Sequence, residues 1–229
     1  MWFERAILRV SAAAMLFCAG AYANEVISNG NFSAGLTGWT VFTTPNGTNG
    51  TGEPTVATFT PVSSPAETAV QFDVGQATGG SMDFEGGGLS QTVNLAAGML
   101  NVSVGIGAQG GTSFNLFGGI AELLIDSQPV AGYNFGSLQA GQVVSSTLTY
   151  DALVADGPHT LAIEFLRPAT SDNTTPSQYA YDFSADEFSD VPEPSSAGFF
   201  LLGIAGLAGY YKAMRGRTHL GRSARPRVI

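Results

Sequence analysis

Few side chains in the long middle segment of the chain have the types needed for enzymatic chemistry. Residues 24–190 contain one histidine, His159, and no cysteine. A nucleophilic hydrolase commonly relies on a histidine base, and no Gly-x-Ser-x-Gly turn accompanies His159. Its context, Asp156–Thr160, is typical of a turn that enters a strand. The sequence therefore predicts that the protein is not an enzyme, although its many acidic residues leave a glycosidase-type carboxylate pair open.

Glycine clusters and a proline triplet mark other places where chemistry could occur. Gly79-Gly80 and Gly86–Gly88 predict turns, and neither precedes a helix-like pattern or a lysine, so neither is a phosphate-binding loop. In the segment 191–194, two prolines fix φ and keep the backbone extended, as a processing enzyme that binds an added strand requires. A helix-breaking linker is the alternative. The predicted processing motif is Val191, Pro192, Glu193 and Pro194.

An apolar run follows the prolines and ends in positive charge. Residues 197–211 carry no charged side chain, and Lys212, Arg215 and Arg217 come next. Fifteen helical residues span about 23 Å, and a helix continued to residue 213 approaches the roughly 30 Å hydrocarbon core. The positive-inside rule places the basic cluster in the cytoplasm and the middle segment outside. We expect one transmembrane helix at 197–213 and a basic cytoplasmic extension at 218–229. The alternative is a buried core helix, which leaves the adjacent basic residues unexplained.

The N-terminus has the pattern of a secretory signal peptide. Two arginines form a positive leader, residues 10–19 are apolar, and Ala21-Tyr22-Ala23 supplies the small residues that signal peptidase requires. We expect a signal helix at 1–23. A buried helix is one alternative, and a lipoprotein signal ending at Cys18 is another, which the large preceding Phe17 disfavours.

Charge separates the middle segment from both ends. Residues 24–190 hold sixteen of the eighteen acidic residues and one basic residue, Arg167, so their formal charge is −15, whereas the whole chain carries −9. This acidity excludes nucleic acid as a partner. It also repels anionic polysaccharide unless divalent cations screen the two surfaces.

The order of proline triplet, apolar run, basic cluster and chain end resembles the C-terminal sorting signal of PEP-CTERM proteins. The resemblance covers residues 191–217, and the longer tail at 218–229 departs from the family. It implies a substrate of an exosortase in an exopolysaccharide-producing Gram-negative bacterium. It also implies a single-pass precursor in the inner membrane, whose outer domain is released or transferred to the cell surface or the extracellular matrix.

Residues 24–190 predict an all-β domain. Short runs of β-branched and apolar residues alternate with Gly, Pro, Asn and Ser clusters, and both Leu100–Ile106 and Leu161–Phe165 place an apolar side chain at every second position. A jelly-roll-type β-sandwich closes one core from such strands, and another sandwich topology is the alternative. The nine predicted strands are 39–43, 55–60, 69–74, 89–94, 100–106, 120–126, 142–150, 159–166 and 178–188.

Two segments of this domain resemble galactose-binding-like jelly rolls, which include many carbohydrate-binding modules. Asn29–Trp39 matches their Asn-Gly-x-Phe opening and the Gly-Trp that follows, although Ser33 stands where the pattern usually has Glu. Tyr179–Phe188 matches their last strand. In many such modules a structural Ca²⁺ bridges the first and last strands; ordinary solvated acids are the alternative here. The implied calcium ligands are Asp182, Glu25 and Asn31.

These features predict a secreted, transiently membrane-anchored protein with a structural or interaction role at the surface or in the exopolysaccharide matrix. A carbohydrate-binding module with a structural calcium ion is the alternative, and a hydrolase is a third reading. Sugar binding needs exposed aromatic rings, yet Trp39 at a strand start is expected in the core. The other candidates, which the sequence does not place together, are Tyr133, Tyr150, Tyr179 and Tyr181.

Overall fold

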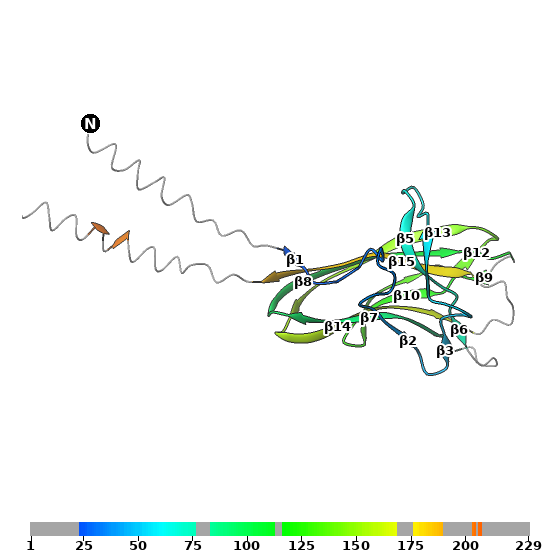
Figure 1. Ribbon diagram of the computed structural model, residues 1–229, viewed down its shortest axis with the longest axis horizontal. Helices are drawn as coiled ribbons and strands as arrows, with labels where there is room; N and C mark the ends of the chain where they lie inside the picture. The colour runs from blue at the N-terminus through cyan, green and yellow to red at the C-terminus, as the bar shows by residue number, and fades with distance from the viewer. Residues whose placement is uncertain are drawn as a thin grey trace, which may run out of the picture. The chain divides into compact units, whose positions relative to one another are not determined.

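The computed structural model of the chain describes residues 23–76, 83–112, 116–168, 176–189, 203–204 and 206–207. Residues Ala21–Ser189 form a compact unit, and its described part contains fifteen β-strands in antiparallel pairs (Figure 1). The structure confirms the predicted all-β sandwich, because two large sheets enclose one hydrophobic core.

The first large sheet has six strands in the order β13-β8-β15-β5-β4, with β1 also pairing with β15. Its strands are β1 (Ala23–Glu25), β4 (Thr55–Phe59), β5 (Glu67–Phe72), β8 (Gly98–Gln109), β13 (Val143–Val154) and β15 (Ser177–Ser189). The second sheet has five strands in the order β11-β10-β14-β7-β2. Its strands are β2 (Thr40–Thr43), β7 (Glu85–Leu95), β10 (Ile120–Ile125), β11 (Gln128–Asn134) and β14 (Gly157–Arg167).

Two short ribbons complete the described part of the sandwich. One joins β3 (Gly47–Thr48) to β6 (Gly75–Gln76), and the other joins β9 (Leu116–Phe117) to β12 (Ser137–Leu138). The fully buried guanidinium of Arg167 lies beside both ribbons: Nε donates to Phe117 O at 2.8 Å, and Nη1 donates to Val74 O at 3.2 Å. The sole basic residue of the middle segment is therefore a structural link inside the fold.

Alternating apolar residues build the core as predicted. In β8, Leu100, Val102, Val104 and Ile106 are buried, and in β14 every second side chain from Leu161 to Phe165 is buried as well. Because successive side chains of a strand point to opposite faces, each strand contributes one apolar row to the space between the sheets. All nine predicted strands are present, with ends shifted by a few residues.

The predicted turn at Gly86–Gly88 is wrong, because these glycines lie inside β7. A Cβ on Gly86 would lie 1.9 Å from Phe165 O, and one on Gly88 would lie 1.9 Å from Ile163 O. The backbone of β14 thus approaches β7 more closely than any larger residue permits. The glycines serve strand packing and form no turn.

Several predicted segments lie outside the described residues. These are the signal segment up to residue 22, the predicted turn at Gly79-Gly80, the processing motif at 191–194, the basic cluster Lys212, Arg215 and Arg217, and the extension at 218–229. Of the expected transmembrane helix at 197–213, only residues 203–204 and 206–207 are described, and these are helical. Within the described parts of the chain, no helix reaches the length and apolar character that a membrane crossing requires.

Candidate functional site

A β-bulge in β15 interrupts the pairing of this strand with β8 inside the six-stranded sheet. The pairing of β15 with β8 shifts register between Tyr181 and Ser184, and Asp182 adopts a φ of 45°. On its other side, β15 pairs with β5 before the bulge and with β1 after it. The bulge therefore lies where the partner of β15 on this side changes from β5 to β1. Bulges of this kind change the direction in which nearby side chains point.

The loop after β1 hydrogen-bonds to β15 on the side where β1 and β5 pair with it. Val26 N donates to Ala185 O at 2.9 Å, and Phe183 N donates to Gly30 O at 3.0 Å. A Cβ on Gly30 would lie 1.8 Å from Phe183 O, so only glycine fits there. The N-terminal segment thus continues along β15 past the bulge.

Asn29 shapes the loop that follows. Its Nδ2 donates to Gly35 O at 2.9 Å and to Thr37 O at 3.0 Å, and its Oδ1 accepts from Ala34 N at 3.0 Å. Its φ of 54° lies in the left-handed region, which asparagine tolerates better than most residues. The asparagine of the Asn-Gly-x-Phe opening is therefore a structural turn residue.

Trp39 is a core residue, as expected. Its side chain is 8% exposed and lies 5.3 Å from the ring of Phe32 and 5.2 Å from the ring of Phe183, centroid to centroid. Its Nε1 donates to Asn29 O at 3.1 Å. These contacts fasten the N-terminal loop to β15, and they leave Trp39 unavailable as a platform for sugar.

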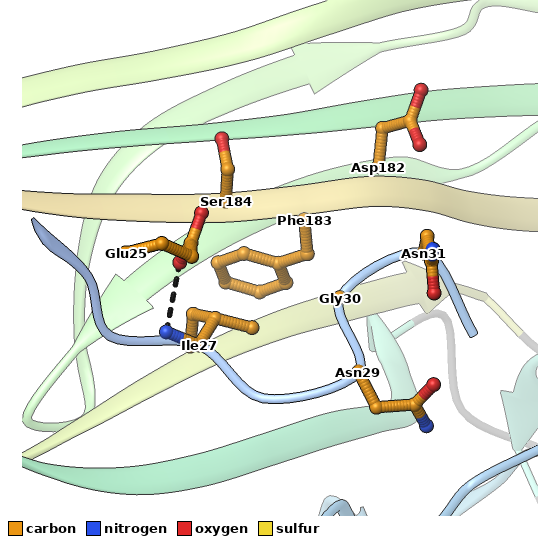
Figure 2. A pocket seen from close by; sticks show the side chains of 8 residues that line it. All are labelled: Glu25, Ile27, Asn29, Gly30, Asn31, Asp182, Phe183 and Ser184. Carbon is orange, nitrogen blue, oxygen red and sulfur yellow. Dashed lines mark hydrogen bonds between the residues drawn. The ribbon is translucent and has the colours of Figure 1, made fainter. Parts of the chain in front are cut away.

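A pocket of about 400 Å³ lies between this loop and the bulge. Figure 2 shows Asp182 and Asn31 at one end of the pocket and Glu25 at the other, with Phe183 and Ser184 between them on β15. The structure therefore brings all three residues predicted as calcium ligands into one pocket. Its lining is completed by Ile27, Asn29 and Gly30.

Two side chains of this pocket already accept hydrogen bonds from the backbone. Glu25 Oε1 accepts from Ile27 N at 2.8 Å and from Ala185 N at 3.0 Å, so this carboxylate joins β1 to β15. Asn31 Oδ1 accepts from Ser33 N at 3.1 Å. Carboxylate and amide oxygens suit a hard cation such as Ca²⁺. However, no three His, Cys, Asp or Glu residues of the described chain gather as a metal cluster. The side-chain oxygens of Asp182 and Asn31 therefore lie at one end of the pocket, and the carboxylate of Glu25 lies at the other.

His159 fastens a turn and has no ring nitrogen left for a general base. Its Nδ1 lies 2.7 Å from Asp126 Oδ2, and its Nε2 lies 3.1 Å from Ala155 O. Thr160 N donates to Asp126 Oδ1 at 2.9 Å. The bond to Asp126 is the main cause that raises the pKa of His159, and the bond from Thr160 is the main cause that lowers the pKa of Asp126.

This arrangement predicts a pH-dependent stability. The contribution of His159 is fully present below pH about 6.5, the pKa of an unfolded histidine, and is lost as the pH rises through the higher folded pKa. We expect the wild type to lose stability relative to His159→Gln between mildly acidic and mildly alkaline pH, by less than about 1 kcal/mol. Denaturant unfolding of both proteins at the two pH values measures this. A stability difference that does not change with pH contradicts a stabilising contact between protonated His159 and Asp126.

Strand register brings acidic residues opposite each other that are far apart in the sequence, and one such pair lies in the five-stranded sheet. Glu122 of β10 lies directly opposite Glu164 of β14. Burial raises the pKa of Glu164, and the charges of Glu122 and Glu85 raise it further. Like charges directly opposite on neighbouring strands are destabilising. Their positions could be recognised only once the register of β10 and β14 was known.

The candidate sugar-binding tyrosines do not form an exposed platform in the described structure. Tyr179 and Tyr181 lie together, but Phe59 covers them, with its ring 4.4 Å from the ring of Tyr179 and 5.7 Å from that of Tyr181. Both tyrosines are buried. Tyr133 packs against Phe135, and Tyr150 packs against the main core.

Among solved structures, the chain is similar to TmCBM61 in complex with β-1,4-galactotriose, with 14% identity, a TM-score of 0.42 and coverage of 71% of this chain and 97% of that one. It is also similar to the CBM22-1 xylan-binding domain of Paenibacillus barcinonensis Xyn10C, with 11% identity, a TM-score of 0.39 and coverage of 76% and 100%. Tailspike protein 4 of bacteriophage CBA120 shares 16% identity at a TM-score of 0.41, over 70% of this chain and 21% of that one.

No curated protein matches the chain by sequence. A family match does cover residues 190–217, and it is described as the PEP-CTERM protein-sorting motif. The matched range contains the four residues of the predicted processing motif and the basic cluster Lys212, Arg215 and Arg217. The chain thus carries a PEP-CTERM sorting motif, which begins one residue after the last strand of its β-sandwich.

Proposed function

We propose that the protein is a secreted precursor, held transiently in the inner membrane and processed by an exosortase at Val191–Pro194. The product is an acidic β-sandwich with a structural or interaction role at the cell surface or in the exopolysaccharide matrix. One observation carries this proposal: the sorting motif starts at residue 190, and β15 ends at Ser189.

The position of β15 explains why processing leaves the outer domain intact. This strand lies between β8 and β5 in the six-stranded sheet, and its pairing with β8 extends to Ser189, opposite Gly98. A cut after residue 190 removes no residue from the strand. The prolines at 192 and 194 lack backbone N–H donors, which disfavours a continuation of β15 through the motif.

The predicted signal-peptidase cut lies at the same end of the sandwich. Ala23 pairs with Phe188, and Asn24, the expected mature N-terminus, pairs with Glu187. Cleavage after Ala23 shortens β1 by one residue and retains Glu25, whose carboxylate holds β1 against β15. Signal peptidase, exosortase and the inner membrane are therefore the partners that this proposal requires.

A comparison of two strains of the native host tests the proposed function. In the parent strain the sandwich is expected in the outer or extracellular fraction, and in a strain without exosortase it is expected in the inner-membrane fraction. An antibody against residues 24–190 follows both forms. Equal release from the two strains contradicts processing by exosortase.

The pocket at the bulge supports the alternative of a calcium-bearing carbohydrate-binding module, because it gathers Glu25, Asn31 and Asp182. Millimolar Ca²⁺ is then expected to raise the unfolding midpoint of the released domain by roughly 5 °C, since a ligand bound only by the folded state stabilises it. Asp182→Asn removes this increase, whereas Asp156→Asn, an exposed acid in the β13–β14 turn, retains it. A midpoint that Ca²⁺ leaves unchanged contradicts the calcium site.

A further inference from the structure

Both strands that lead to the processing sites leave the sandwich at one end. Ala23 at the start of β1 pairs with Phe188 near the end of β15, as the adjacent strand ends in Figure 1 show. The β7–β8 and β13–β14 turns lie beside them, because Gly98 pairs with both Val154 and Ser189. We call this region the exit end. It consists of residues 23, 95–99, 153–158 and 188–189.

Three large apolar side chains form a row on the outer face of the exit end. Met99 is the direct partner of Leu153 on one side and of Phe188 on the other, so the three side chains share one face of the sheet. The neighbouring Leu100 points into the core, which places Met99 on the outer face. Leu153 is 79% exposed and Met99 is 41% exposed. We call Met99, Leu153 and Phe188 the exit-end patch.

The exit end carries little of the charge of this domain. Among its residues only Asp156 is ionisable, although the segment 24–190 has a formal charge of −15. Glu187, the residue before Phe188, is 8% exposed, and its Oε1 accepts from Ala96 N at 2.7 Å. Asp151 and Asp186 follow farther along the strands, both opposite Asn101. The exposed charge that a bilayer with anionic lipids would repel at the exit end is therefore that of Asp156.

The proposed tether at 197–213 brings this end close to a membrane. Eight Cα steps separate Ser189 from residue 197, where the apolar run begins, and an extended chain covers at most about 29 Å in that distance. Because the tether is short, the lipid surface always lies within reach of the exposed apolar row at the exit end. Exposed apolar patches of this kind often mark contact sites.

We propose that the exit-end patch contacts the lipid surface while the precursor is tethered. This inference rests on the proposed membrane tether at 197–213. Three side chains bind lipid too weakly to hold a free domain, but a short tether supplies an effective concentration on the order of mM. The contact therefore lasts only while the tether is intact, and cleavage at 191–194 both cuts the chain and frees the domain from the bilayer.

Fluorescence quenching on the uncleaved chain in phosphatidylcholine nanodiscs tests this contact. After signal removal the chain has no cysteine, so Ala97→Cys at the exit end and Ala140→Cys in the β12–β13 turn each accept one fluorophore. A lipid-borne quencher is expected to quench the label at residue 97 more strongly. Adding Met99→Ser and Leu153→Ser is expected to lower that quenching roughly threefold, because the apolar contact with lipid is lost.

Val62→Ser provides the matched control. Val62 is 56% exposed and hydrogen-bonds through its N–H to Ser145, far along β13 from Leu153, so its substitution is expected to leave the quenching unchanged. An unchanged thermal midpoint shows that the serine variants remain folded. If the Met99 and Leu153 substitutions leave the quenching unchanged, the proposed lipid contact is overturned. The proposed tether is not overturned by this result, since it still holds the chain in the nanodisc. A chain that nanodiscs fail to retain overturns the tether, and with it both the proposed function and this inference.

Discussion

A chain in which Glu193 is replaced by alanine is expected to keep its C-terminal segment and to remain in the inner-membrane fraction of the native host. Glu193 is the only charged residue between Asp190 and Lys212, so it is the one charge that an enzyme can recognise in the extended segment. Loss of a hydrogen bond to a charged group costs about 1.5–3 kcal/mol, which corresponds to a tenfold or larger fall in processing. Quantitative immunoblotting of the membrane and released fractions measures this ratio.

Asp156→Ala is the control for this experiment. Asp156 is an exposed acid at the same end of the sandwich, outside the sorting motif, and its loss is expected to leave processing unchanged. Neither substitution changes a residue of a described strand, because Asp156 lies in the β13–β14 turn and Glu193 follows β15. Both variants are therefore expected to fold like the wild type. If Glu193→Ala is released at the wild-type rate, the proline triplet is a linker and not a recognition element.

Replacement of Arg167 by alanine is expected to destabilise the sandwich by about 3–5 kcal/mol. The side chain is fully buried, donates to Phe117 O and Val74 O, and fills the space beside Gly119. Burial lowers the pKa of Arg167 to about 10, and the charge of Asp73 opposes this change. Alanine leaves a cavity, unpaired carbonyl oxygens and an uncompensated acidic group. Urea unfolding of residues 24–189, the extent of the compact unit after signal removal, measures the loss.

Arg167→Met separates the two causes of this effect. Methionine restores much of the volume but supplies no donor, so it is expected to recover the part of the loss that comes from the cavity. If the free energy of unfolding of Arg167→Ala lies within about 1 kcal/mol of the wild-type value, the structural role of Arg167 is contradicted. In that case neither its hydrogen bonds nor its packing contributes measurably to stability.

The strands were predictable because their apolar residues recur at every second position. Leu100–Ile106 is the clearest example, because its even-numbered residues are all buried and Asn101 and Ser103 are partly exposed. Gly105 is also buried, since the ring of Tyr181 covers it. β11 was missed because Pro129 and Gly132 interrupt its pattern. Both residues are tolerated there because β11 lies at the edge of its sheet and pairs only with β10.

The bulge in β15 could not be predicted from alternation. Tyr179, Tyr181 and Phe183 alternate in the sequence, which places all three on one face of a regular strand. In the structure the tyrosines belong to the outer cluster with Phe59, whereas Phe183 belongs to the main core. The extra residue at Asp182 reverses the two faces, and no local feature of the sequence announces it.

The pocket residues were found by resemblance, and their individual tasks needed the structure. The sequence placed Glu25 and Asp182 near the first and last strands, and these strands do lie together. The two backbone N–H groups that occupy Glu25 Oε1 became visible only in the fold. Long-range pairs such as Glu122 with Glu164 also depend on strand register, which the order of residues alone does not determine.

Intact-mass analysis of the protein from its native host tests the central claim most directly, because it reads both ends of the mature chain at once. We expect the protein in the outer or extracellular fraction to begin at Asn24 and to end within residues 191–195. A species in that fraction that still ends at Ile229 contradicts the claim that residues 190–217 are a removable sorting signal.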